Sequence, residues 1–306
     1  MTGAEAVLPR RFNPAPGLYA ISATTLDGVP LPYPATYSWF RHREPFAKIG
    51  YAMFLYRVGE PTSAPRWLAQ CTVPAPPLTP AAIEEGFGVP NLRQIAFDCT
   101  QSWIYPGEGE TPGWIALNTP GIDALRWPRE TAHLKWWPVW TEALPRSTVD
   151  LSYVQPQSGA LPPFAIWTRQ PTDLSGAYDP RPTALEGTLT FLGASAPERA
   201  AAGEPLAVMT YWRVESVPAR PLSLMLHLRA PDGAGLAVGD GLGVPIDQWR
   251  TDDVLVQRHV LAVPGTAEDA EGGVLVGGAY WLDDLSRLET ADGAGEFIVS
   301  NVRIVP

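Results

Sequence analysis

From residue 186 to the C-terminus, the chain repeats short runs of aliphatic, aromatic and β-branched residues separated by turn clusters such as APDGAG and GDGLG. No helical pattern lies between the runs, which favours two antiparallel sheets over a βαβ arrangement. The runs are TLTFLG, LAVMTYWRV, LSLMLHLRA, VLVQRHVLAV, GVLVGGAYWL and EFIVSNVRIV. We therefore predict an acidic antiparallel β-sandwich of the Ig-like or jelly-roll type over residues 183–306.

One of these runs shows the alternation of a half-buried strand especially clearly. Every second residue in it is a leucine: Leu222, Leu224, Leu226 and Leu228. Successive side chains of a strand point to opposite faces, so the four leucines share one face. We expect that face to lie on the core of the sandwich.

Composition changes near residue 182. Residues 1–182 hold 26 of the 34 prolines and nine of the 12 tryptophans. Residues 183–306 carry 8 basic and 17 acidic residues, so most of the negative charge lies there. The connecting sequence TRQPTDLSGAYDPRPTALEG is rich in turn-forming residues. We place a domain boundary at this point, between domains 1–182 and 183–306.

The N-terminal domain also contains many strand-like runs, together with a short helix signal. In LTPAAIEEGFG, Thr79 is suited to cap a helix, Pro80 to begin it and Gly86 to end it. A later segment is interrupted by Pro128 and Pro138, which break a helix into pieces. The domain is therefore predicted to be Pro- and Trp-rich and α+β or β-rich, and the whole chain mostly β.

Overall composition excludes several classes of protein. Hydrophobic residues make up 45% and charged residues 18%, which is typical of a folded chain. No apolar stretch approaches the roughly 18 residues of a membrane span, and the N-terminal sequence has no signal-peptide pattern. The net charge is −10, and we find no basic cluster of the kind that binds nucleic acid.

The two cysteines, Cys71 and Cys99, lie in the strand-like runs WLAQC and IAFDC. Cysteines on paired strands can form a disulfide in a chain that is exported from the cytoplasm. Two buried thiols are the alternative. No cysteine or histidine pair has the spacing of metal ligands, and we expect neither a metal nor another cofactor.

Aromatic residues crowd the N-terminal domain. Their rings offer flat apolar faces to the C–H faces of sugars, while Asp98 and Glu108 supply carboxylates for sugar hydroxyls. Alternatively, the rings fill the core. In LKWWPVW the interrupting proline prevents all three rings from facing one way, so we expect at least one at the surface. The candidate aromatic binding residues are Trp103, Tyr105, Trp114, Trp136, Trp137 and Trp140.

Acidic residues suggest two further interpretations. Asp98 with Glu108 or Glu110 could form the carboxylate pair of a glycan-active hydrolase, although PGEGETPG is more simply an exposed turn. The pairs Asp252–Asp253 and Asp283–Asp284 could help to bind calcium, or could lie in solvated loops. The sequence predicts no catalytic residue.

Two sets of motifs resemble the soluble C-terminal region of bacterial polytopic glycosyltransferases related to dolichyl-phosphate-mannose protein mannosyltransferases. The first set lies in Gly17–Val58 and comprises Tyr19–Ala23, Trp39–Arg41, Arg43–Pro45 and Ile49–Val58. The second resembles the β-sandwich appended to such enzymes in filamentous phototrophic bacteria. It comprises Gly203, Pro205, Tyr211–Arg213, His227–Leu228, Pro231–Gly233, Asp240–Gly241, Pro245, Trp249, His259–Pro264 and Gly278–Leu288.

The resemblance implies a location and argues against catalysis. In that family the transmembrane helices carry the polyprenyl-phosphate-sugar site, and an early extracytoplasmic loop carries the catalytic acidic residue. This sequence contains no such helices. The resemblance therefore implies an extracytoplasmic, membrane-associated or cell-surface module without its own catalytic activity.

Together these observations predict a recognition module that binds a glycan or a partner protein, with a membrane-embedded subunit as one such partner. A structural subunit of a surface or membrane-associated assembly is the alternative. A glycan-active hydrolase is the third hypothesis.

Overall fold

The computed structural model describes residues 9–28, 34–41, 43–60, 65–118, 149–150, 164–169, 182–266 and 272–305. They fall into two compact units. The first unit takes its residues from 1–95, 112–122 and 144–169, and the second from 96–111, 123–143 and 170–306. Residues 96–111 precede the predicted boundary at residue 182 and nevertheless belong to the second unit.

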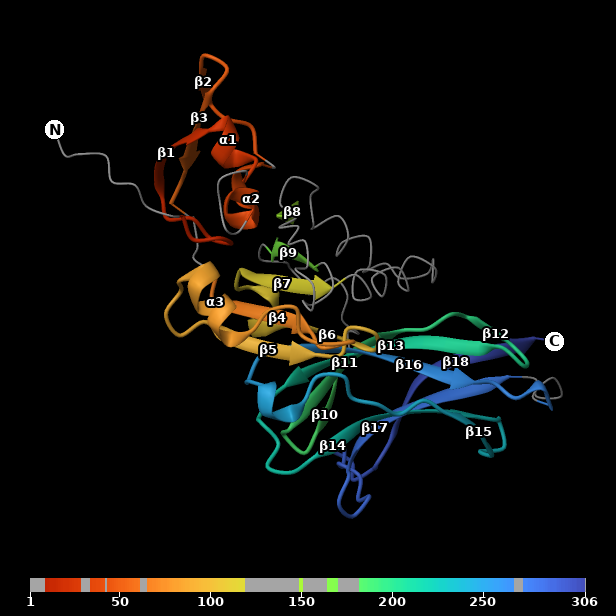
Figure 1. Ribbon diagram of the computed structural model, residues 1–306. Coiled ribbons are helices and arrows are strands. Elements are labelled where there is room, and N and C mark those ends of the chain that lie inside the picture. The colour runs from red at the N-terminus through yellow and green to blue at the C-terminus, as the bar shows by residue number, and fades with distance from the viewer. Residues whose placement is uncertain are drawn as a thin grey trace. The chain divides into compact units, whose positions relative to one another are not determined.

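The second unit contains two five-stranded sheets (Figure 1). The order of the first sheet is β10 (Thr183–Leu185), β11 (Leu189–Ser195), β13 (Pro205–Val214), β16 (Val254–Ala262) and β6 (Ser102–Tyr105). The order of the other sheet is β12 (Arg199–Ala201), β18 (Phe297–Val305), β17 (Gly273–Trp281), β14 (Leu222–Arg229) and β15 (Gly235–Val238). The 3-10 turns η2 (Pro106–Gly109) and η4 (Ile246–Gln248) lie between strands.

Both sheets contribute to one apolar core. Val208 on β13 and Leu261 on β16 cluster with Leu226 and Leu228 on β14 and with Leu275 on β17. The predicted leucine face is confirmed, since none of its four side chains is more than 1% exposed. All six predicted runs form strands, and the predicted mostly β fold class is confirmed. The Ig-like or jelly-roll type stays a prediction.

Strand β6, which is distant in the sequence, is the last strand of the first of these two sheets. It pairs antiparallel with β16, and Trp103 lies opposite Val256. Ser102 donates its hydroxyl hydrogen to Gln257, and the Gly243 amide donates to Ser102 Oγ over 2.9 Å. These polar groups are satisfied inside the protein, as burial requires. The sheets are also not wholly antiparallel, because β12 pairs parallel with β18.

The first unit begins with a three-stranded sheet of order β1 (Gly17–Ser22), β3 (Met53–Val58) and β2 (Ala47–Ile49). The short helices α1 (Ala23–Leu26) and α2 (Ser38–Arg41) and the 3-10 turn η1 (Pro34–Tyr37) accompany it. Ile21, Phe40 and Tyr56 form its core and are no more than 4% exposed. One face of the sheet is therefore packed against the helical segments.

A five-stranded sheet and one longer helix complete the described part of the first unit. The strand order is β5 (Arg93–Phe97), β4 (Trp67–Cys71), β7 (Gly113–Asn118), β9 (Phe164–Arg169) and β8 (Val149–Asp150). β4 and β7 are parallel, whereas β7 and β9 are antiparallel. The unit thus combines helices with strands, as predicted. No described helix is both long and apolar enough to cross a membrane.

Helix α3 (Pro80–Phe87) forms where the sequence predicts it but ends later. Thr79 Oγ1 accepts a hydrogen bond from the Ala82 amide over 3.2 Å, so Thr79 is the predicted N-cap. The helix passes through Gly86 and ends at Gly88, whose φ of 57° is left-handed. Gly86 serves a different purpose: a Cβ there would lie 2.2 Å from Cδ2 of Phe12. It admits the Phe12 ring against the helix.

Candidate functional site

The predicted aromatic residues that the structure describes are buried. Trp103 and Tyr105 are 2% and 3% exposed on β6, and Trp114 is 4% exposed on β7. Trp103 packs edge-on against Phe97, with ring centroids 5.3 Å apart. The alternative interpretation, that large rings fill the core, therefore holds for Trp103 and Tyr105, and also for Trp114, which belongs to a core cluster with Phe12, Leu68 and Phe87. Trp136, Trp137 and Trp140 lie outside the described residues.

The carboxylate of Asp98 accepts hydrogen bonds from the residues that follow it in the same turn. Its Oδ1 accepts hydrogen bonds from the amide and hydroxyl of Thr100 over 2.9 and 2.6 Å, and its Oδ2 accepts from Gln101 Nε2 over 2.7 Å. The Asp98 amide donates to the Gly243 carbonyl over 2.7 Å. Asp98 therefore fastens the segment before β6 to the sandwich, which is a structural role.

Glu108 is engaged by different donors. Its Oε1 lies 2.9 Å from Nη1 of Arg213, whose Nε lies 2.9 Å from Glu215. Hydrogen bonds from Thr190 and Arg213 outweigh desolvation and lower the pKa of Glu215. Asp98 and Glu108 thus serve separate networks, and the hydrolase hypothesis gains no support from them.

Cys71 and Cys99 are both disulfide-bonded, and the chain has only these two cysteines. They are 0% and 1% exposed. The disulfide prediction is therefore confirmed over two buried thiols.

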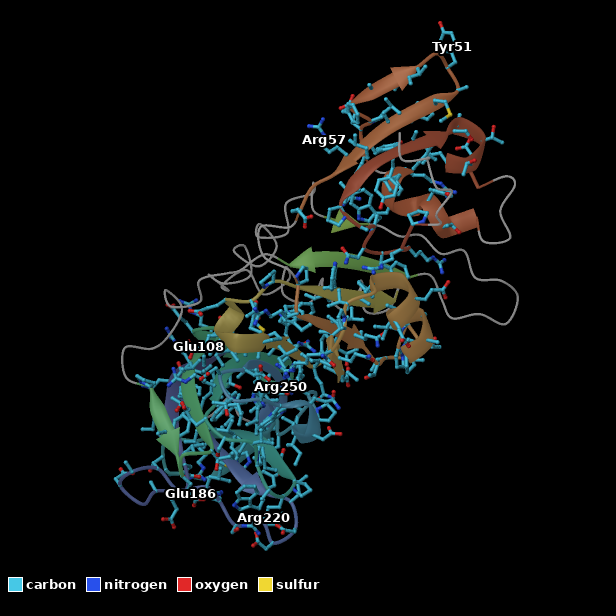
Figure 2. All side chains as sticks on the ribbon, turned by 90° about the vertical axis from the view of Figure 1, so that its left-hand side faces the viewer. Tyr51, Arg57, Glu108, Glu186, Arg220 and Arg250 are labelled. Carbon is cyan, nitrogen blue, oxygen red and sulfur yellow. The ribbon has the colours of Figure 1, made fainter. Side chains whose placement is uncertain are left out.

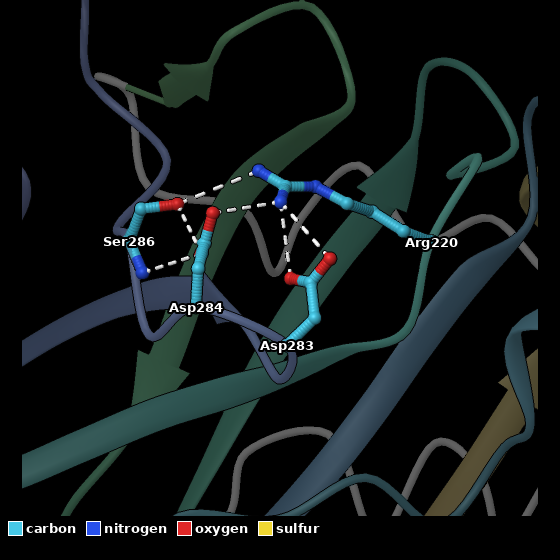
Figure 3. A network of polar contacts seen from close by, with 4 residues as sticks. All are labelled: Arg220, Asp283, Asp284 and Ser286. Carbon is cyan, nitrogen blue, oxygen red and sulfur yellow. Dashed lines mark hydrogen bonds and ion pairs between the residues drawn. The ribbon is translucent and has the colours of Figure 1, made fainter.

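Three of the four aspartates considered for calcium, Asp253, Asp283 and Asp284, accept hydrogen bonds from groups of the protein itself. Figure 3 shows Arg220 between Asp283 and Asp284, with Nη1 3.0 and 2.9 Å from their carboxylates. The Ser286 hydroxyl and Arg220 lower the pKa of Asp284 to about 2. Asp253 is fully buried and accepts from the Arg250 amide over 2.8 Å. In these loops the carboxylates of Asp283 and Asp284 bind the Arg220 guanidinium, and the carboxylate of Asp253 binds a backbone amide.

The first unit contains a pocket of about 320 Å³ that combines aromatic, cationic and polar side chains. It is bounded by the N-terminal segment 10–16, by the end of α2, by the chain after β3 and by β7. The residues with chemical groups for a ligand are Arg10, Asn13, Trp39, Arg43, Glu60 and Trp114.

Helix α3 positions one wall of this pocket. The amides of Phe12 and Asn13 donate to the Gly86 carbonyl over 2.9 and 3.2 Å. Asn13 Nδ2 donates to the Phe87 carbonyl over 3.2 Å. The Arg10 side chain lies against Gly88, since a Cβ at Gly88 would lie 2.3 Å from Arg10 Nε. The glycines of α3 thus let the N-terminal segment run close along the helix.

The other walls contribute aromatic rings. The guanidinium carbon of Arg43 lies 3.3 Å from the centroid of the Trp39 ring, and Arg43 Nη1 donates to the Trp39 carbonyl over 2.7 Å. This arrangement is a cation–π contact that fixes the arginine. The Trp114 ring packs against Phe87, with centroids 4.6 Å apart. Arg43 is thus held against Trp39 and Arg10 against the end of α3, so contacts within the first unit fix both arginines of the pocket.

Sequence reasoning found Trp114 but missed the other pocket residues. Trp39 and Arg43 do fall within the quoted motifs that resemble the glycosyltransferase tail, yet these motifs carry no assigned chemistry. Arg10 and Glu60 have no local signal at all. The pocket forms from segments that meet only in the fold, so no spacing in the sequence marks it.

Compared with protein-family profiles and with curated proteins, the chain matches none.

Proposed function

We propose that the chain is a non-catalytic recognition module whose first-unit pocket binds a glycan. The observation that carries this proposal is the pocket that joins two tryptophans with two arginines, a glutamate and an asparagine. Ligand pockets typically combine an apolar lining with a few polar groups that fix orientation. Sugars present the same combination, with apolar C–H faces and polar hydroxyls.

The polar groups of the pocket suggest which sugars to test. Asn13 and Glu60 provide an amide and a carboxylate for hydroxyl groups, and Arg10 and Arg43 provide donors. The pocket lining contains two cationic side chains and one carboxylate, so sugars that bear a carboxylate or sulfate belong in the test together with neutral ones.

The disulfide supports the proposed location outside the cytoplasm. Disulfides persist in oxidising compartments and are rare in the cytosol. The buried Cys71–Cys99 bond is in keeping with export, and with the extracytoplasmic location that the family resemblance implies.

A glycan-array screen tests the proposal. The wild type is expected to retain a defined group of glycans, and the double variant Arg10→Ala/Arg43→Ala to lose them. Arg250→Ala is the matched control, because this exposed arginine lies in the second unit. Equal binding by the wild type and the double variant would show that the glycan does not bind in this pocket.

A structural subunit is the second candidate, and exposed apolar side chains favour it. Leu18 and Ile49 in the first unit are 71% and 62% exposed. Surfaces of this kind mark protein or membrane contacts when they are contiguous. A stable oligomer in light scattering, together with an array that retains no glycan, would favour this function over recognition.

A further inference from the structure

The three-stranded sheet of the first unit has one packed face and one open face. Cross-strand partners share a face, so Tyr19 and Tyr56 lie together on the packed side. On the opposite side Leu18 pairs with Arg57 on β3, and Ile49 pairs with Met53. Leu18 is 71% exposed and Ile49 62%, although both are aliphatic residues in strands. We call this side the open face.

The hairpin that joins β2 to β3 extends the exposed apolar surface. Tyr51 in its turn is fully exposed, with a relative exposure of 101%. Figure 2 shows its side chain projecting from the hairpin turn, away from the strands of this sheet. Phe46, just before β2, is 55% exposed. The open face therefore ends in an unburied aromatic tip.

A basic side chain accompanies these apolar residues. The guanidinium carbon of Arg57, on the open face, lies 5.3 Å from the Phe46 ring centroid. Lys48 in β2 pairs with Phe54 and therefore lies on the packed side of the sheet, where its side chain is exposed. Residues 10–60 contain six basic and three acidic residues, a net charge of +3. The whole chain has a net charge of −10, so this region opposes the charge of the rest.

We propose that the open face, with Leu18, Ile49 and Tyr51 as its anchors, docks on an anionic lipid surface. Peripheral proteins bind membranes through exposed apolar side chains combined with Lys and Arg, and the two contributions add. Tyrosine is suited to the boundary between headgroups and acyl chains because its ring is apolar and its hydroxyl polar. The aliphatic stem of Arg57 can lie along apolar surface while its charge reaches a phosphate group.

A second copy of the chain fits this face less well. Two copies joined through it would set two net-positive regions against each other, which opposes association. The strands are also only three to six residues long, which is small for the roughly 800 Å² per partner of a stable interface. Charge complementarity therefore favours anionic lipid. This inference does not depend on the glycan proposal, which concerns the pocket.

Vesicle flotation of the full chain tests the proposal. The chain is expected to float with vesicles of equal parts phosphatidylcholine and phosphatidylglycerol, and to stay at the bottom with phosphatidylcholine alone. The variant Leu18→Ser/Ile49→Ser/Tyr51→Ser is expected to lose at least about tenfold in partitioning. Added salt should weaken binding by the wild type, because it screens the charges.

Two further variants make the result decisive. Arg57→Gln keeps the apolar anchors and is expected to weaken partitioning by about fivefold. Val238→Ser/Ile298→Ser removes residues of similar exposure, 63% and 70%, from the second unit and should float like the wild type. Near-ultraviolet circular dichroism confirms that each variant is folded.

Several outcomes would overturn the proposal. One is a wild type that does not float at low salt, and another is an anchor variant that floats as well as the wild type. A dimer in light scattering that the anchor variant turns into a monomer, without any vesicle binding, would assign the open face to a second copy.

Discussion

The Nε2 atom of His259 lies 2.8 Å from the hydroxyl oxygen of Thr210 in the core of the second unit. The indole Nε1 of Trp212 donates to the same hydroxyl over 2.7 Å, and His259 Nδ1 lies 2.6 Å from the Gly239 carbonyl. The Thr210 hydroxyl hydrogen therefore points to Nε2, and the ring proton sits on Nδ1. His259 is only 1% exposed, so this histidine is held neutral.

The first prediction concerns stability below neutral pH. Burial lowers the pKa of His259 from 6.5 to about 4, against smaller opposing effects of Gly239 and Asp240. Between these two values the unfolded chain binds a proton that the folded chain does not, so stability falls as the pH drops from 6.5 to 4. The contribution of this residue is at most about 3 kcal/mol. Urea unfolding at several pH values measures it.

Substituting the histidine isolates its contribution. His259→Gln is expected to flatten the pH dependence of the unfolding free energy in this window, whatever it does to stability at pH 7. His227→Gln is the control, because His227 is half-buried beside Asp240, with Nε2 3.2 Å from its carboxylate. If His259→Gln kept the slope of the wild type, the assignment would be wrong.

The leucine run and the short helix show how far local patterns reach. Leu222 and Leu224 alternate with other residues, and period-two alternation depends only on the pleat of the strand, so the core face could be predicted. Thr79 and Pro80 likewise mark the start of α3 through their own chemistry. The predicted helix end at Gly86 is wrong, because a glycine suits the end of a helix and also a position where another side chain packs closely against the helix. Only the fold brings Phe12 to that position.

The pairing of β6 with β16 shows where local patterns fail. Ser102 and Gln257 are 155 residues apart in the chain, and nothing near either residue identifies the other as its partner. The aromatic character of Trp103 fits both a binding surface and a core, so the sequence leaves both interpretations open. Its burial depends on which strand covers it, which the sequence does not encode locally.

A second prediction tests the close packing at α3. Gly86→Ala is expected to destabilise the chain by about 1–3 kcal/mol, because the new methyl group overlaps the Phe12 ring. Gly235→Ala is the control, since a Cβ there meets no atom within 4 Å and the change should cost less than about 0.5 kcal/mol. Thermal unfolding measures both. Equal effects of the two variants would contradict the packing of Phe12.

A third prediction concerns the disulfide. The variant Cys71→Ala/Cys99→Ala is expected to lose about 2–4 kcal/mol of stability, because an open chain gains conformational freedom when it unfolds. Dithiothreitol should lower the unfolding midpoint of the wild type and leave that of the double variant unchanged. Free thiols detected in the unreduced, denatured wild type would show that the bond is missing.

A fourth prediction separates two aspartates that look alike in the sequence. Asp253 is fully buried and accepts from backbone amides, so Asp253→Ala is expected to cost about 1–3 kcal/mol. Asp283 is half-exposed beside Arg220, so Asp283→Ala should cost less than about 1 kcal/mol. Chemical denaturation of both variants gives the comparison, and a reversed order would contradict the assigned roles.

The central claim is that the first-unit pocket recognises a glycan. Calorimetric titration of an array-selected glycan into matched variants tests it most directly. We predict one site per chain in the wild type, loss of binding in Asn13→Ala/Glu60→Gln, and unchanged binding in Trp136→Ala/Trp137→Ala. Unchanged binding by the pocket variant, with loss in the tryptophan variant, would contradict the account and place recognition in the LKWWPVW segment.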